Sequence, residues 1–358
     1  MTPSSRSRPN SLIDELEKAR GELHTAAVEV HSARAGVSMD FSVIIPAYNV
    51  SGIVGRAIRS AAAQTFPPLE ILVIDDCSSD DTAEVVMALR EEIPSLRLLS
   101  TPANGGPSAA RNVGLREAKA DWIGLLDADD AWKPARLERL SEVALATSAD
   151  FVADDLVMWD IVADLEFKPA YYELPEPQKQ ISLLDMFRGE DDFNISKASF
   201  GLMKPILRRK FLADHKLEYD EGINFAEDLA LYVESLFNGA KVIMINEAYY
   251  IYSVPNAPSG RSPHSRSLKD YRKIQRVGDT LSQKYADRID PKLKRAIDAF
   301  RKTTTLLLES NAARTYKRSG QYAKYLAYLA ARPELTRRLV SRYAWSIGTR
   351  MNKRGSAV

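Results

Sequence analysis

Short apolar runs alternate with longer amphipathic segments between residues 41 and 153 of this chain. The apolar runs lie at residues 41–45, 69–74, 96–99, 122–126 and 151–153. Each has the length and continuous hydrophobicity of a strand that is buried on both faces. The segments between them repeat apolar residues with helical spacing, at residues 52–64, 79–91, 108–118 and 134–147. Strands that alternate with helices of this length predict βαβ units, a mostly parallel sheet and an α/β fold.

The flanking regions are patterned differently. Residues 1–38 have a polar start rich in Ser, Arg and Pro, followed by a loosely amphipathic stretch, which predicts a disordered segment and then a helix. Residues 156–200 contain three prolines and show no clear period, so we expect loops around a short helix at 181–187. An irregular stretch of this length is often a lid or a substrate loop.

The last part of the chain is predicted to be mainly helical. A helix is expected at 228–238, followed by two short strands at 241–245 and 248–252 and a polar loop at 253–266. From residue 267 the pattern is helical to the end. We therefore divide the chain into an N-terminal segment (1–38), a catalytic domain (39–266, with halves 39–155 and 156–266) and a C-terminal helical region (267–358).

Composition excludes several classes of protein. Hydrophobic residues make up 45% of the chain and charged residues 27%, as in soluble globular proteins. The net charge of +1 gives no electrostatic case for binding nucleic acid. A single cysteine, Cys77, excludes an intramolecular disulfide and a cysteine metal cluster, which fits a cytoplasmic location. We find neither a secretory leader nor an apolar run long enough to span a membrane.

Three carboxylates follow the apolar run at 122–126, and they are Asp127, Asp129 and Asp130. Because unpaired buried charge is too costly inside a sheet, they are expected where the strand leaves it. That edge is where open α/β sheets bind ligands. Carboxylates this close repel one another and favour a cation, and oxygen ligands suit Mg²⁺ or Mn²⁺, which also hold phosphates. The alternative is an acidic loop that caps the next helix.

A second acidic pair, Asp75 and Asp76, ends the strand at 69–74. In a parallel sheet both strand ends point to one edge, so the two clusters can share a cleft. One cluster would accept hydrogen bonds from a nucleobase or ribose, and the other would hold the metal that bridges phosphates. The alternative for Asp75 and Asp76 is turn-and-cap chemistry.

Further polar groups are expected at the same edge. Tyr48 can stack on a base, the turn at 104–106 allows close approach of a ligand, and Arg111 can reach phosphate or base. Asp228 follows Glu227 at a helix start, where it is either a general base or ordinary N-terminal helix charge.

Other motifs are absent or weak. The chain has no phosphate-binding P-loop and no G-x-G-x-x-G after a strand, which disfavours a P-loop NTPase and a dinucleotide oxidoreductase. The four histidines show no metal-ligand spacing. His264, in the polar loop, is the one that could approach a metal or phosphate.

Several motifs together resemble those of the family 2 glycosyltransferases. In chain order they are Ser42-Val43-Ile44-Ile45-Pro46-Ala47-Tyr48-Asn49, Gln64-Thr65, Glu70 to Thr82 with Asp75-Asp76, Asn104-Gly105-Gly106-Pro107-Ser108-Ala109-Ala110-Arg111-Asn112, Leu126-Asp127-Ala128-Asp129-Asp130, Ala226-Glu227-Asp228-Leu229, and Tyr250-Ile251-Tyr252 with Ser259. The resemblance covers residues 41–261. Cys77 departs from the Gly or Asn that is usual in the family, and Ser79 departs from Thr.

The resemblance implies a GT-A fold and an inverting transfer of a hexose from a nucleotide-sugar, usually a UDP-sugar such as UDP-glucose. Matched residue by residue, it implies a role for each site residue. Uracil would be held by Pro46, Tyr48 and Asp76, with Arg111 beside the base. Asp127 would contact the ribose side, and Asp129 would bind Mn²⁺ or Mg²⁺ across the pyrophosphate. Asp228 would be the base, while Ser259 and Arg261 would contact the leaving diphosphate. The roles of Asp130 and Glu227 stay open.

The C-terminal helices are similar, more weakly, to those of bacterial exopolysaccharide glycosyltransferases, including those of succinoglycan assembly. This implies a saccharide or lipid-linked oligosaccharide acceptor and peripheral contact with the inner face of the cytoplasmic membrane. The basic residues after 332 and the aromatics among them suit an interfacial helix. A helix packed on the domain with a solvated basic face is the alternative.

Two other functions stay open from the sequence. One is a nucleotide-sugar-binding protein without transferase activity, against which the full set of carboxylates argues. The other is a nucleotidyltransferase, which would need a Gly-rich loop with Arg or Lys near the first strand; residues 46–52 lack it.

Overall fold

The computed structural model describes residues 39–160, 163–168, 172, 174–187, 200–223, 226–254 and 271–340. The predicted N-terminal segment and helix lie outside the described residues. So do Ser259, Arg261 and His264 in the polar loop, and the tail after residue 340.

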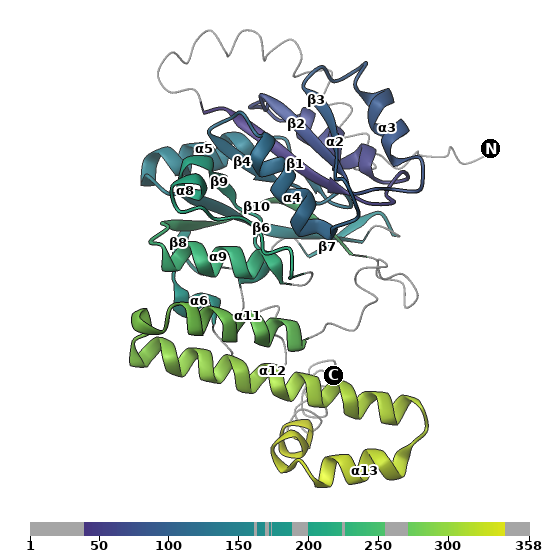
Figure 1. Cartoon of the computed structure of the whole chain (residues 1–358), viewed down its shortest axis with the longest axis vertical. Coiled ribbons are helices and arrows are strands. Elements are labelled where there is room, and N and C mark those ends of the chain that lie inside the picture. Colours follow the sequence, from purple (N-terminus) through teal and green to yellow (C-terminus); the bar gives the residue numbers. More distant parts are fainter. Residues whose placement is uncertain are drawn as a thin grey trace, which may run out of the picture.

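The described elements follow the predicted alternation through the first half of the chain (Figure 1). The strands are β1 (Phe41–Ala47), β2 (Glu70–Asp75), β3 (Leu96–Ser100), β4 (Trp122–Leu125), β5 (Ala131–Trp132), β6 (Phe151–Asp160), β7 (Leu165–Lys168), β8 (Gln178–Ile181), β9 (Ile206–Arg208) and β10 (Val242–Val254). The helices are α2 (Val54–Ala62), α3 (Thr82–Leu89), α4 (Gly106–Glu117), α5 (Arg136–Thr147), α6 (Leu183–Met186), α8 (Arg209–Asp214), α9 (Glu227–Phe237), α11 (Tyr271–Lys284), α12 (Pro291–Arg318) and α13 (Tyr322–Ala330). Two single turns of 3-10 helix, η1 (Phe200–Leu202) and η2 (Ala286–Arg288), complete the set.

One mixed sheet runs through the described part of the chain, in the order β3-β2-β1-β4-β9-β6-β10-β5. Strands β3, β2, β1 and β4 pair in parallel, as predicted. Short antiparallel β9 joins β4 to β6, and β6 then pairs in parallel with β10. The predicted parallel sheet is thus found within residues 39–155, and antiparallel pairings enter with the later strands.

Two strand predictions were wrong in length. The strands expected at 241–245 and 248–252 are one strand, β10, which continues through register irregularities between Met244 and Tyr250. The strand expected at 151–153 continues to Asp160, although its middle is polar. Asp154 and Asp155 interrupt the apolar pattern, and both are buried. Asp154 pairs with Arg136, and Asp155 accepts from the N–H groups of Leu156 and Tyr172, so both carboxylates have partners that allow the strand to continue.

Both faces of the sheet are covered by apolar side chains. Alternate residues of β1 point to opposite sides, with Val43 and Ile45 packing in one cluster together with α2 and α5, and Ile44 packing in the other with α4 and α9. Gly124 in β4 allows close packing on the first of these faces, since an added Cβ there would lie 2.8 Å from the Trp132 ring. The result is a rigid three-layer support for the strand ends.

The C-terminal helices divide into a packed part and an extended part. Ile274 and Leu281 of α11 and Phe300 of α12 belong to the same core cluster as α9. Beyond them, the far half of α12 packs with residues around Leu335 in a separate small cluster, and α13 extends away from the sheet (Figure 1). Within the described residues, no helix is both long and apolar enough to cross a membrane.

Candidate active site

The ends of β1, β2 and β4 meet at one edge of the sheet, as the sequence predicted. In the parallel register Ala47 lies opposite Asp75, and the Asp76 N–H donates to the Ala47 carbonyl over 2.8 Å. β4 runs beside β1 in the same direction. Loops after the first two strands are tied together, because the Ser79 N–H donates to Oδ1 of Asn49 over 2.8 Å.

Asp76 lies in a cradle of backbone and hydroxyl donors. Its Oδ1 accepts from the Gly105 N–H at 3.0 Å and from the Thr101 hydroxyl at 2.7 Å, and its Oδ2 accepts from the Gly106 N–H at 2.7 Å. Gly106 has φ of +79°, which a side chain would disfavour. A carboxylate has about four acceptor positions, so these three bonds leave one for a ligand donor.

Helix α4 links this cradle to the second acidic cluster. Its first residue, Gly106, binds Asp76, and Arg111 lies five residues further along, about 7 Å at the helical rise. Nη2 of Arg111 donates to Asp127 over 2.8 Å, and Nη1 donates to Glu227 over 2.9 Å. The guanidinium also lies over the Tyr219 ring, at 5.3 Å from its centroid.

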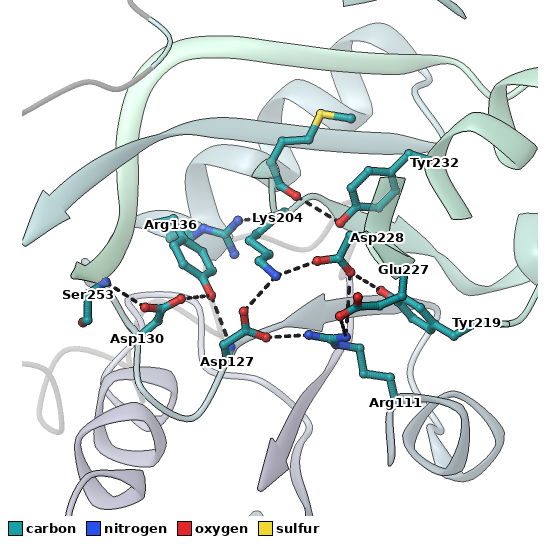
Figure 2. A network of polar contacts seen from close by, with 12 residues as sticks. Arg111, Asp127, Asp130, Arg136, Lys204, Tyr219, Glu227, Asp228, Tyr232 and Ser253 are labelled. Atoms are coloured by element: carbon teal, nitrogen blue, oxygen red, sulfur yellow. Dashed lines mark hydrogen bonds and ion pairs between the residues drawn. The ribbon is translucent and has the colours of Figure 1, made fainter. Parts of the chain in front are cut away.

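Asp127 and Asp228 come from distant parts of the chain and share one cation. Nζ of Lys204 lies 2.8 Å from Oδ2 of Asp127 and 2.7 Å from Oδ2 of Asp228 (Figure 2). The Tyr219 hydroxyl donates to the other oxygen of Asp228 over 3.0 Å. The end of β4 and the start of α9 therefore both face the Lys204 ammonium group.

The backbone at Ala226 sets the direction of α9. Ala226 adopts a left-handed conformation, with φ of +66° and ψ of +27°, immediately before the helix begins at Glu227. A non-glycine residue in this region is strained, and such strain is concentrated at functional sites. It places Glu227 and Asp228 in the first helical turn, where the helix dipole favours negative charge.

Residues 42–207 match the family described as Glycosyl transferase family 2. These residues form a family 2 glycosyltransferase domain. The chain is 35% identical over 216 residues to the succinoglycan biosynthesis protein ExoO, and 32% identical over 217 residues to ExoU, both from Rhizobium meliloti. Each alignment covers 60% of this chain, and it spans 61% of ExoO and 62% of ExoU, less than two thirds of either relative.

Solved structures show the same fold. The structure of S. aureus TarS residues 1–349 superposes with a TM-score of 0.52 at 20% identity, covering 81% of this chain and 90% of that one. A structure of the same TarS fragment in complex with UDP-GlcNAc gives the same TM-score and coverage. The predicted GT-A architecture is thereby confirmed.

In the glycosyltransferase domain, Asp130 points inward. Its carboxylate accepts from the Tyr250 hydroxyl and from the Ser253 N–H, each over 2.8 Å, and it is 2% exposed. The same Tyr250 hydroxyl accepts from the Asp127 N–H over 3.2 Å. Asp130 therefore fixes the loop after β4 to β10.

A fully buried ion pair, Arg136 with Asp154, supports the residues that contact this loop. Arg136 donates to Asp154 through Nη2 at 2.8 Å and through Nε at 3.0 Å, and both side chains have no exposed surface. Asp154 also accepts the backbone N–H groups of Tyr249 and Tyr250. Arg136 donates in addition to the Lys204 carbonyl. The pair thus fixes the backbone at Lys204 and Tyr250, and the side chains of these two residues contact Asp127 and Asp130.

The surrounding charges shift the pKa values of these groups in opposite directions. Burial raises the pKa of Asp127, but Lys204 and Arg111 outweigh this effect and hold it well below its ordinary value. Burial raises the pKa of Asp129, and the negative charge of Asp127 raises it further. For Asp130, burial and then Asp129 and Asp127 raise the pKa well above its ordinary value.

Asp129 suits a divalent cation better than the other carboxylates do. It is partly exposed, and among the described residues its carboxylate has no ion-pair partner within 4.0 Å. Its raised pKa means that a nearby cation would stabilise its charged form. The described part of the chain holds no group of three or more metal-ligating side chains.

Three of the residues predicted to bind the nucleotide lie at the ends of two neighbouring strands. Pro46, Tyr48 and Asp76 lie at the ends of β1 and β2, and Tyr48 is 39% exposed, as a stacking residue should be. Asp127 and Glu227 hold the guanidinium of Arg111, and its place beside a base stays a prediction.

Sequence reasoning missed five residues that position the site. They are Arg136, Asp154, Lys204, Tyr219 and, in its exact contacts, Tyr250. A signal was present for two of them: Asp154 interrupts an apolar strand, and Lys204 lies two residues before strand β9. A charged residue at such a position needs a partner, although the sequence does not say which.

Proposed function

We propose that this protein is a metal-dependent inverting glycosyltransferase that moves a hexose from a UDP-sugar, UDP-glucose by preference, to a hydroxyl of an oligosaccharide. The observation that carries the proposal is the convergence of Asp127, from the donor side, with Asp228, from α9, on one lysine at 2.8 and 2.7 Å. Transfer needs a donor site and a base at one point, and this arrangement supports the assignment of both.

Asp228 is proposed as the general base. The acceptor hydroxyl gives its proton to the Asp228 carboxylate as its oxygen attacks the anomeric carbon. The bond to the diphosphate oxygen breaks, and its electron pair leaves with UDP. Each Asp228 oxygen holds one hydrogen bond or ion pair, so an acceptor position is left to receive the proton. One displacement inverts the anomeric centre.

The nucleotide is proposed to bind across Pro46, Tyr48 and Asp76. Uracil N3–H would donate to the free acceptor position of Asp76, with Tyr48 against the ring. Asp127 would face the ribose side, and Ser259 and Arg261 would meet the diphosphate. TarS has been solved in complex with UDP and with UDP-GlcNAc, which supports a UDP-linked donor for this fold.

Asp129 is proposed to hold Mn²⁺ or Mg²⁺. When bound, such a cation stabilises the negative charge that develops on the leaving diphosphate. Replacing Asp129 by Asn should lower transfer by about 100-fold or more, as expected for the loss of electrostatic stabilisation of a transition state. EDTA should abolish wild-type activity, and added Mn²⁺ should restore it. Full activity of metal-stripped wild-type protein would contradict the metal proposal.

The acceptor is proposed to be a growing, lipid-linked oligosaccharide in exopolysaccharide synthesis. The likeness to ExoO and ExoU, named for succinoglycan biosynthesis, supports this class. A cytoplasmic protein that meets the inner face of the membrane through its C-terminal helices would reach such an acceptor. Tyr322 and Leu326, one turn apart on α13, are 60% and 64% exposed, which suits this contact.

The test is a donor screen with purified protein and Mn²⁺. UDP-sugars are supplied one at a time, and UDP release is measured with and without a lipid-linked oligosaccharide acceptor. We expect acceptor-dependent UDP release from one hexose donor. A protein that binds no UDP-sugar, with or without metal, would contradict the proposal. A protein that binds a donor but never transfers would favour the nucleotide-sugar-binding alternative.

A further inference from the structure

Lys204 is a buried cation that the proposed chemistry does not use. It lies between η1 and β9 and is only 4% exposed. A buried ammonium is very unfavourable without partners. Two carboxylates supply them here: Asp127 at 2.8 Å and Asp228 at 2.7 Å. Burial lowers the pKa of Lys204, but these two charges outweigh it and raise the pKa overall.

Lys204 connects two carboxylates that differ in their other hydrogen-bond partners. Asp127 is also held by Arg111 and, through its N–H, by Tyr250. Asp228 is also held by Tyr219, whose own backbone exchanges two hydrogen bonds of 2.8 Å with the Asn112 side chain. Arg111 approaches Asp228 less closely, at 4.0 Å, because the same nitrogen binds Glu227. Lys204 is therefore the tight link between the donor side and the base.

Lys204 is itself firmly held. Its carbonyl accepts from Arg136, which is paired to Asp154 in the core. Pro205 follows it and restricts the conformation of the backbone at Lys204. A side chain anchored in this way can fix the position of the groups it contacts.

We infer that Lys204 is a positioning residue for the transfer step, which holds the Asp228 carboxylate at a fixed place relative to the donor-side Asp127. The inference rests on the proposed role of Asp228 as the base. Removal of the ammonium would leave Asp228 without its close cation, with Arg111 only at 4.0 Å, so the base would move away from Asp127. Asp127 would stay in place through Arg111 and Tyr250, so donor binding would be retained.

The experiment compares Lys204→Met, Lys204→Arg and Lys204→Gln with wild type, in kcat, in KM for the UDP-sugar and in Kd for UDP by calorimetry. Because a displacement of about 1 Å can cost about 100-fold in rate, we expect kcat of Lys204→Met to fall by about that factor. The KM for donor and the Kd for UDP should stay within about threefold of wild type, and Lys204→Arg should recover most of kcat. If Lys204→Met does not fold, Lys204→Gln takes its place.

Lys241→Met is the matched control, since Lys241 is partly buried and its Nζ donates to the Thr147 carbonyl over 2.6 Å, outside the acidic cluster. It should keep the wild-type kcat. A wild-type kcat in Lys204→Met would overturn the inference. So would a loss of UDP affinity equal to the loss of kcat, because Lys204 would then be a donor contact. Asp228→Asn separates the two proposals: if it transfers at the wild-type rate the base assignment fails, whereas if it is inactive and Lys204→Met is fully active only the lysine inference fails.

Discussion

Two carboxylates end parallel strands of this sheet, and the protein holds them in different ways. Asp76, after β2, accepts mainly from backbone N–H groups of one glycine turn. Asp127, after β4, is held by the side chains of Arg111 and Lys204. A backbone cradle carries no net charge and leaves its carboxylate free to accept one more donor. A cluster of charged side chains instead balances charge against charge, and each member depends on the others.

The comparison separates binding from chemistry. The uncharged cradle suits recognition of a neutral donor such as a base N–H, because no ion pair has to be broken. The charged cluster suits a step in which protons and phosphate charges move. The following changes test this separation, beginning with the largest expected effect.

Asp228→Asn should lower transfer by about 10²- to 10⁴-fold, since an amide cannot take up the acceptor proton. The affinity for UDP should stay unchanged, because the Asp76 cradle is untouched. The measurements are UDP release under saturating donor and UDP binding by calorimetry. Asp214→Asn, which removes an exposed partner of Lys210 in α8, is the control and should keep wild-type activity. Equal losses of transfer and UDP affinity would mean that the two regions do not act separately.

Arg136→Met should reduce the free energy of unfolding by about 3–5 kcal/mol, because Asp154 would be left as an uncompensated buried charge. Replacing both partners, as Arg136→Met with Asp154→Leu, should recover a large part of this loss. Urea unfolding followed by circular dichroism gives the comparison. Unfolding of the single variant at the wild-type urea concentration would show that the acidic cluster does not depend on this pair.

Asp76→Asn should reduce stability by about 1 kcal/mol, the size of one net hydrogen bond, since one of the Gly105 and Gly106 N–H groups would lose its acceptor. Affinity for UDP should fall, whereas transfer at saturating donor should fall less. Asp81→Asn, an exposed residue before α3, is the control for stability. The idea of a recognition cradle fails if Asp76→Asn binds UDP with wild-type affinity.

Glu70, at the opposite edge of the sheet, should affect stability alone. Burial raises its pKa, but the Lys119 N–H, Ser42 and Arg97 outweigh this and lower it below its ordinary value. A lowered folded-state pKa means that the carboxylate stabilises the protein above the unfolded value, about 4.3, and that this stabilisation is lost as pH falls through the folded-state pKa.

Glu70→Gln should therefore cost about 1 kcal/mol at pH 7, the size of one net hydrogen bond, and the difference from wild type should shrink below about pH 4. Urea midpoints at pH 7 and pH 3.5 measure this. Activity per folded molecule at pH 7 should be unchanged, because Glu70 lies away from the acidic cluster. A constant difference between the two proteins at both pH values would contradict the assignment.

The sequence alone determined the parallel strands and their helices, because burial on both faces of a sheet requires continuous apolar runs. It also determined that Asp76 and Asp127 end strands at one edge, since direction in a parallel sheet follows from chain order. Local turn chemistry was readable at Asn49, which suits a turn and takes positive φ after β1, whereas the positive φ of Cys77 was not predicted.

Only the tertiary structure decided which charges meet. Nothing near Lys204, Asp154 or Arg136 in the sequence indicates which residues they pair with, and their partners lie 18 or more residues away in the chain. The two strands expected at 241–245 and 248–252 form one strand, β10, along which β6 pairs. The Asp130 carboxylate points into the protein, where it accepts from the Tyr250 hydroxyl. Local patterns fix what is buried, because burial repeats along the chain, whereas charge pairing depends on distances that only the folded chain sets.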